Sequence, residues 1–293
     1  MRGTGVLVLA SLLAVPAFAA ETLPVGGLHS GGTLAGSISH LAMDPDNVDV
    51  DIPRRFNAAF GGTYALPLSA KTSFQVDALI DGALQRQDDG DQTLFEGTAA
   101  GHWSWRDPSS HLAGVFGGAG FSRDNGDNEG DAIPFYFLGV EGQAYFNRVT
   151  LQGQLGFLDG QDNWLETIEN AYFGRVVASY YPTDNTRISL EAAALHGDRP
   201  NNDPDSGGII DIFTAGMRVD HALPGTGLSV FGAYNFYDFH PTEESDAPWV
   251  HEFRIGLVKH FGSTSTFDND RNAAGLDLPP VARWISISTN EIE

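Results

Sequence analysis

The sequence of 293 residues contains no cysteine and only 16 basic residues. The absence of cysteine excludes disulfide bonds, a thiolate nucleophile and zinc–thiolate sites. The 38 acidic residues give a formal net charge of −22, which argues against binding nucleic acid or anionic lipid headgroups through bulk charge. Beyond the N-terminal stretch there is no apolar run long enough for a spanning helix. If this chain crosses a membrane, it must do so with strands.

The N-terminal stretch has the three parts of a secretory signal. An early arginine precedes a short apolar run, and the small-residue triplet Ala17-Phe18-Ala19 follows. A transmembrane anchor is the alternative, but the apolar run is shorter than the ~20 residues that a spanning helix needs. We therefore expect residues 1–19 to be a signal peptide and the rest of the chain to be exported.

Most of the remaining chain alternates apolar and polar residues at period two. In the stretch RISLEA (187–192), every second residue is apolar, which indicates a β-strand with different surroundings on its two faces. Eleven such segments, with a weaker one near residues 34–41, predict twelve strands of the kind that cross membranes as barrels. The 35 glycines and the aromatic content of 11% suit closely approaching strands.

The connections between these segments alternate in length. Short ones such as DPSS and PTDN are followed by long, acidic ones such as SRDNGDNEGDAI. Outer-membrane barrels have short periplasmic turns and longer outer loops. We therefore predict an all-β fold, a transmembrane antiparallel up-and-down β-barrel of about 12 strands. Its expected parts are a periplasmic N-terminal segment (20–32), the barrel (33–261) and a periplasmic C-terminal extension (262–293).

Aromatic residues gather near the expected strand ends. Those near the short turns are Tyr64, Trp103, Trp105, Tyr145, Phe146, Tyr180, Tyr181 and Phe261. Side chains with an apolar body and a polar tip suit the boundary between lipid and water, so two aromatic rings are predicted there. The alternative is a soluble β-sandwich, which gives no reason for aromatics to collect at strand ends. The pattern favours lipid on the apolar faces and an aqueous lumen on the polar ones.

Several hairpins resemble those of Gram-negative outer-membrane β-barrels of the porin-like kind, in particular largely uncharacterised barrels from alphaproteobacteria. The similar stretches are HWSWRDPSSHLAGVFG, GVEGQAYFNRVTLQGQLGF and FGRVVASYYPTDNTRISLEAA. The stretch FRIGLVKHF also resembles the terminal-strand signal read by the barrel-assembly machinery, with Phe253, Ile255, Leu257 and Phe261 in step. It departs from that pattern because Lys259 is in step too and residues 262–293 follow. The resemblance implies an outer-membrane location, with lipid and lipopolysaccharide as surroundings.

Strand parity also predicts which charged side chains face the lumen. These are Asp77, Asp81, Glu96, Glu141, Glu191, Asp220, Glu252, Arg55, Arg106, Arg175, Arg187, Arg218 and Arg254. They form either a ladder of ion pairs that makes a narrow barrel rigid or a constriction that filters small solutes. Arg175 should lie diagonal to Glu191. The predicted pore-lining residues are Arg175, Arg218, Arg254, Glu141, Glu191, Asp77 and Glu96.

The expected function is a porin-like channel for passive or weakly selective diffusion of small solutes. The alternative is a non-conducting structural or surface-interaction barrel that acts through its acidic extracellular loops. The clusters at 88–91 and 123–131 are either solvated loops or calcium ligands without EF-hand spacing. Strand number alone does not decide permeability.

An enzymatic function is not expected. His102 and Ser104 share one strand face, as the base and nucleophile of outer-membrane phospholipase do, but no Asn-Gly follows the serine. Parity also turns both side chains into the lumen, so a structural histidine bonded to carboxylates of the Glu96 type is the favoured interpretation. The other histidines lack metal-binding spacing. We expect no catalytic residue, metal or cofactor.

Overall fold

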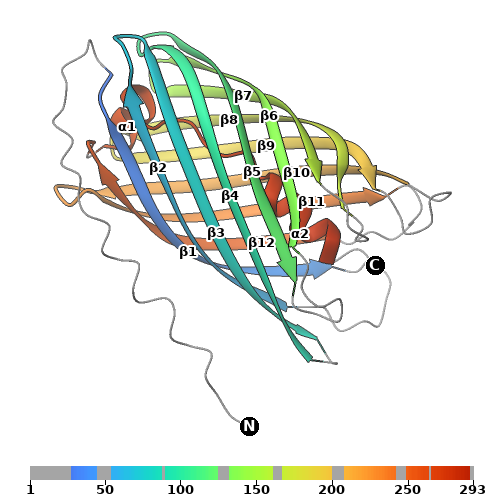
Figure 1. Cartoon of the computed structure of the whole chain (residues 1–293). Coiled ribbons are helices and arrows are strands. Elements are labelled where there is room, and N and C mark those ends of the chain that lie inside the picture. Colours follow the sequence, from blue (N-terminus) through green and yellow to red (C-terminus); the bar gives the residue numbers. More distant parts are fainter. Residues whose placement is uncertain are drawn as a thin grey trace.

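The computed structural model describes residues 28–44, 54–87, 90–124, 132–160, 167–199, 208–241, 249–263 and 265–290. Twelve antiparallel strands form a closed barrel in which β1 pairs with β12 (Figure 1). The strands are β1 (Gly31–Asp44), β2 (Arg54–Pro67), β3 (Thr72–Gln87), β4 (Gly90–Asp107), β5 (His111–Asp124), β6 (Ala132–Phe146), β7 (Val149–Gly160), β8 (Glu169–Thr183), β9 (Thr186–Arg199), β10 (Gly208–Leu223), β11 (Leu228–Pro241) and β12 (Trp249–Phe261). The predicted fold class and strand number are confirmed.

The outer face of the barrel is apolar, and the inner face carries the buried polar side chains of the wall. Leu190 is 58% exposed on the outer face, whereas its neighbour Ser189 is only 7% exposed. Exposed large hydrophobic side chains recur on every strand, opposite buried polar ones. A soluble protein has the reverse arrangement, and this one fits strands that face lipid outside. Because the sheet closes on itself, the alternative of a β-sandwich is wrong.

The two ends of the barrel differ in their connections. Short turns at 68–71, 108–110, 147–148, 184–185 and 224–227 lie at one end, called here the short-turn end. The strands join at the opposite, long-loop end through the longer connections, which lie largely outside the described residues. The expected signal peptide (1–19) and most of the two acidic clusters also lie outside the described residues.

The C-terminal segment (residues 265–290) lies inside the barrel. The sequence analysis predicted instead that it extends into the periplasm. It holds α1 (Thr266–Asn272) and α2 (Val281–Asn290), and the strands enclose both helices (Figure 1). The backbone N–H of Phe267 donates to the Asp184 carbonyl at 3.1 Å, which places α1 at the short-turn end. The physical reason is burial, because the apolar side chains of α2 leave water when the segment enters the lumen.

Gly262 makes this reversal of the chain possible. It directly follows β12 and has a φ of 84°, in the left-handed region that glycine adopts without strain. A Cβ at this position would also collide with the Ser30 carbonyl oxygen. The barrel wall begins at Gly31, two residues before the expected boundary. Neither helix in the described part of the chain is long and apolar enough to cross a membrane.

The aromatic pairs near the short turns divide between the two faces. Tyr180 is 51% exposed on the outer face, whereas Tyr181 is fully buried inside. Phe146 and Tyr145 divide in the same way. The prediction that both members of each pair lie at the lipid boundary is wrong, because successive strand residues point to opposite faces. The inward tyrosines contact the C-terminal segment instead.

Candidate functional site

The predicted pore-lining side chains all lie on the inner face of the barrel. Six of the seven border one internal cavity, namely Arg175, Arg218, Arg254, Glu191, Asp77 and Glu96. Glu141 is also buried, but it lies away from the cavity and contacts His102. Strand parity therefore located these side chains correctly, while their role in conduction stays a prediction.

The inner face of β8 to β12 carries a series of ion pairs. Arg175 contacts Glu191 through two hydrogen bonds, Nε to Oε1 at 2.9 Å and Nη2 to Oε2 at 2.8 Å. This confirms the predicted diagonal contact, and bidentate geometry is the strong form of such a pair. Asp220 accepts from both Arg187 and Arg218, at 3.1 and 2.6 Å.

His102 in β4 is held by two carboxylates, one from β3 and one from β6. Its Nε2 lies 3.1 Å from Asp77 Oδ2, and its Nδ1 lies 2.9 Å from Glu141 Oε1. The expected carboxylate contacts are present, although the carboxylates are not that of Glu96. The Ser104 hydroxyl bonds to Ser73 at 2.9 Å. His102 and Ser104 thus have separate partners and form no base–nucleophile pair in the described structure.

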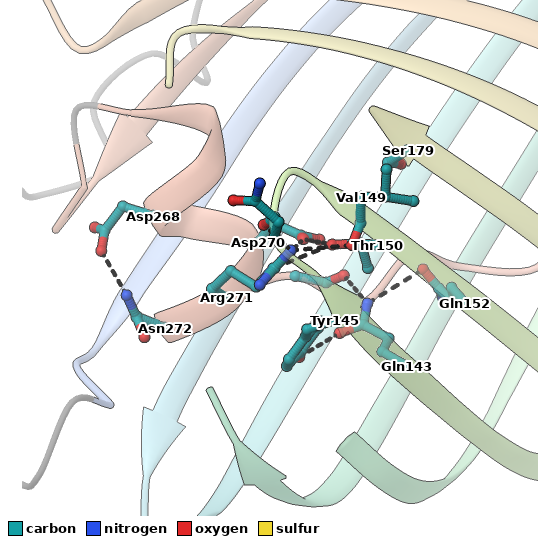
Figure 2. Close-up of polar contacts among 12 residues, drawn as sticks. Gln143, Tyr145, Val149, Thr150, Gln152, Ser179, Asp268, Asp270, Arg271 and Asn272 are labelled. Atoms are coloured by element: carbon teal, nitrogen blue, oxygen red, sulfur yellow. Dashed lines mark hydrogen bonds and ion pairs between the residues drawn. The ribbon is translucent and has the colours of Figure 1, made fainter. Parts of the chain in front are cut away.

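A polar clamp holds α1 at the short-turn end (Figure 2). Arg271 Nη2 donates to the carbonyl oxygens of Asn147 and Val149, at 3.0 and 3.1 Å. Its guanidinium carbon lies 4.4 Å from the ring centroid of Tyr145. The neighbouring Thr150 hydroxyl donates to Asp270 at 2.7 Å. These contacts attach the beginning of the C-terminal segment to the start of β7 and the end of β6.

The extended stretch between the helices is bound through its carbonyl groups. Gln75, Gln143 and Gln154 donate to the carbonyls of residues 276, 275 and 277, at 2.7, 2.7 and 3.0 Å. Arg106 Nη1 donates to three further carbonyl oxygens, those of residues 270, 271 and 273. Polar side chains of the wall thus satisfy backbone acceptors that burial would otherwise leave without partners.

An apolar cluster surrounds α2 in the interior. Trp284 is fully buried, its ring centroid lies 5.7 Å from that of Phe173, and its indole N–H donates to the Thr214 hydroxyl at 2.9 Å. The cluster includes Phe116, Phe135, Phe137, Leu195, Ile210, Ile212, Phe239, Val250, Val281, Ile285 and Ile287. At Gly118 and Gly120 a side chain would collide with the rings of Phe137 and Phe135, so glycine leaves room for this cluster.

The positively charged guanidinium of Arg283, in α2, lies among three carboxylates of the wall. Its Nη2 lies 2.6 Å from Asp81 Oδ2 and 3.4 Å from Glu252 Oε1, and its Nη1 lies 3.3 Å from Glu96 Oε1. These carboxylates come from β3, β12 and β4. Arg254 also contacts Glu252, at 2.7 Å. The guanidinium of Arg283 therefore links three strands of the wall to α2.

A cavity of about 370 Å³ remains beside the C-terminal segment. The segment forms one side of it, and inner faces of β1 to β4 and β8 to β12 form the other. Charges of both signs line it, since Arg175, Arg218 and Arg254 lie on the wall with Glu191 and Glu96. Among the described residues no group of side chains is arranged to hold a metal ion.

The sequence pattern did not reveal the residues that hold the C-terminal segment. A signal was present near the long-loop end, because AIPFYFLGV in β6 is apolar on both faces and IIDIF in β10 is apolar on both faces except at Asp211. A strand that is apolar on both faces is buried on both sides. Such strands predict that an apolar segment fills this part of the lumen. The stretch VARWISIS in α2 is that segment.

No protein-family model matches the chain, and no curated protein matches its sequence. Solved structures match its fold. An outer membrane channel from Pseudomonas putida F1 has a TM-score of 0.60 and 10% identity, covering 84% of this chain and 100% of its own. The translocator domain of autotransporter NalP from Neisseria meningitidis has a TM-score of 0.51 and 11% identity, covering 79% and 88%. The fold is that of an outer-membrane β-barrel.

The strands of the wall determine the fold of an outer-membrane β-barrel, and the two matches extend over most of this chain. At about a tenth of positions identical, they establish the fold alone. What distinguishes this outer-membrane barrel must therefore be sought in its interior, in the ion pairs of the wall and in the C-terminal segment.

Proposed function

We propose that the protein is an outer-membrane channel for small polar solutes, and that its own C-terminal segment closes the lumen until it shifts. The supporting observation is that the segment fills only part of the lumen. Beside it remains a cavity of about 370 Å³ with charges of both signs on its walls. Charged walls at close quarters are the means by which pores select small solutes.

The attachment of the segment is compatible with movement. The twelve strands close into a barrel without it, so the segment contributes no strand to the ladder. It joins the wall covalently only through residues 262–264, after β12. Displacement of the segment would leave the backbone hydrogen bonds of the barrel intact, which is what a gate within a rigid wall requires.

A second candidate is a non-conducting barrel that acts through its loops. The observation that favours it is the burial of α2, in which Val281, Trp284, Ile285 and Ile287 are fully buried. Burial of one such side chain contributes about 1.5–3 kcal/mol. A segment held this firmly would function as a permanent core and leave the long connections as the active surface.

Planar-bilayer conductance separates the two candidates. The full chain is compared with a chain that ends at Ser263, and the strand signal in circular dichroism checks that both are folded. We expect rare openings of the full chain and discrete, lasting steps of the shortened one. A folded shortened barrel that does not conduct would contradict the channel and favour the second candidate.

We also propose that β12 is read by the barrel-assembly machinery and that the barrel surface faces lipid and lipopolysaccharide. Phe253, Ile255 and Leu257 are more than half exposed on the outer face, in step with Phe261. Lys259 interrupts the series, but its ammonium donates to the Thr226 carbonyl at 2.8 Å, toward the short turns. Replacing Phe261 with alanine should lower the amount of assembled barrel in cells, and unchanged assembly would contradict this assignment.

A further inference from the structure

The site around Arg283 contains more buried carboxylate oxygens than its guanidinium group contacts. Asp81, Glu96 and Glu252 are 2%, 4% and 0% exposed. Arg283 contacts all three of these carboxylates, and Arg254 contacts that of Glu252. Glu96 Oε2 is buried without a hydrogen-bond partner in the described structure. A buried carboxylate oxygen in that state is stabilised by a further N–H donor.

The wall holds two of these carboxylates in place independently of Arg283. Glu252 accepts from Ser39, Asn235 and Tyr237, at 2.9, 2.9 and 3.1 Å. Asp81 accepts from Asn57 at 3.1 Å. Each of these donors belongs to the strands, so the carboxylates keep their positions whether or not α2 is docked. Two of the three acceptors are therefore preorganised for a cation.

The cation in this site, Arg283, belongs to the C-terminal segment, which is the part that shifts in the proposed channel. Arg283 lies on α2, and it borders the cavity together with Glu96 and Arg254. When α2 shifts, the three carboxylates lose a cation and become open to the cavity. Buried acids without a cation are costly, so they favour any cation that replaces Arg283.

We propose that Asp81, Glu96 and Glu252 form a binding site for the guanidinium group of a small solute, and that Arg283 is a tethered occupant which this solute displaces. The proposal rests on the proposed channel and adds a substrate class and a means of opening. A guanidinium suits the site because its planar set of N–H donors reaches carboxylates on several sides, as that of Arg283 does. A single ammonium group has fewer donors to share among three acids.

Chemical rescue of Arg283→Ala tests the binding site without requiring conduction. The full-length variant is melted in detergent with millimolar methylguanidinium, and with methylurea at equal concentration, in constant salt. We expect a saturable rise in melting temperature with methylguanidinium alone. The matched control is Arg271→Ala, since that buried arginine lies against aromatic rings and carbonyl oxygens and has one carboxylate, that of Asp270, at 3.7 Å, where Arg283 has three. Absence of saturable rescue, or equal rescue in both variants, would overturn the assigned site.

A second measurement uses the wild-type site and does not depend on the folding of Arg283→Ala. Because the chain has no cysteine, Ser288→Cys gives one thiol at a position that is 1% exposed. Arginine at ten times its dissociation constant should raise the displaced population, and hence the labelling rate by a thiol reagent, about tenfold. Citrulline, which carries a urea in place of the guanidinium, should leave the rate unchanged. Equal effects of both solutes, or none, would contradict displacement by a guanidinium.

The two proposals fail separately. Rescue of Arg283→Ala in a protein whose shortened form does not conduct would retain the binding site and reject the channel. Conduction by the shortened chain without rescue or arginine-dependent labelling would retain the channel and reject the guanidinium site. A labelling rate that rises equally with lysine would assign the site to cations in general and overturn its preference for guanidinium.

Discussion

The indole N–H of Trp284 donates to the hydroxyl of Thr214 at 2.9 Å, which joins α2 to the inner face of β10. The rest of the indole is fully buried in the lumen. Replacing Trp284 with alanine should destabilise the docked helix by about 3–5 kcal/mol, since it empties the site of a large core side chain. We expect a lower melting temperature and more frequent openings in a bilayer.

Thr214→Val is the matched control for this prediction. It keeps the packing but leaves the buried indole N–H of Trp284 without its acceptor, so the loss should be about 1–3 kcal/mol, smaller than that of Trp284→Ala. The strand signal in circular dichroism should persist in both variants at room temperature. Equal melting temperatures of Trp284→Ala and the wild type would contradict the docking of α2.

The adjacent tyrosines Tyr180 and Tyr181 should respond differently to removal. The ring centroid of Tyr181 lies 5.1 Å from that of Phe267 in α1, whereas Tyr180 lies on the outer face. Tyr181→Ala should loosen α1 by several kcal/mol, about the cost of truncating a buried aromatic. Limited proteolysis of the C-terminal segment should then be faster than in the wild type, and Tyr180→Ala should leave that rate unchanged. Similar rates in the two variants would argue against the inward contact.

The ion pair of buried Arg175 and partly exposed Glu191 predicts a non-additive double-mutant cycle. Changing Glu191 to glutamine leaves the buried guanidinium without its partner, at a cost of at most about 3–5 kcal/mol, and changing Arg175 should cost less because water reaches the Glu191 carboxylate. The double variant removes both charges and should be more stable than the sum of the single losses predicts. Urea unfolding in detergent measures all four corners of the cycle. Additive losses would indicate that the two side chains do not interact in the folded barrel.

Charge placed on the two faces of β9 should have opposite consequences. Leu190→Arg puts a cation on the lipid-facing surface, at a cost of about 2–4 kcal/mol near the bilayer midplane. Ser189→Arg puts the same side chain among the polar groups of the interior. We expect the yield of assembled barrel in lipid vesicles to fall much further for Leu190→Arg. Equal yields would refute the orientation of the strand.

The twelve-stranded barrel and its two faces could be derived from the sequence because both are local properties. Side chains alternate across a strand, so neighbours such as Leu190 and Ser189 must lie on opposite faces of the sheet wherever the strand lies. The same rule located the predicted lumen charges and the contact of Arg175 with Glu191. The rule also applies to Tyr180 and Tyr181. Their aromatic character suggested that both lie at the lipid boundary, but as neighbours in a strand they point to opposite faces of the barrel.

The content of the lumen was decided only by the tertiary structure. Arg283 meets Asp81 across 202 positions of the chain, and no period or spacing relates residues so far apart. Which segment fills a barrel depends on whether its shape and charge complement side chains contributed by many strands at once. Alternation fixed the direction of each wall residue, while the sum of these distant contacts placed the C-terminal segment inside the wall.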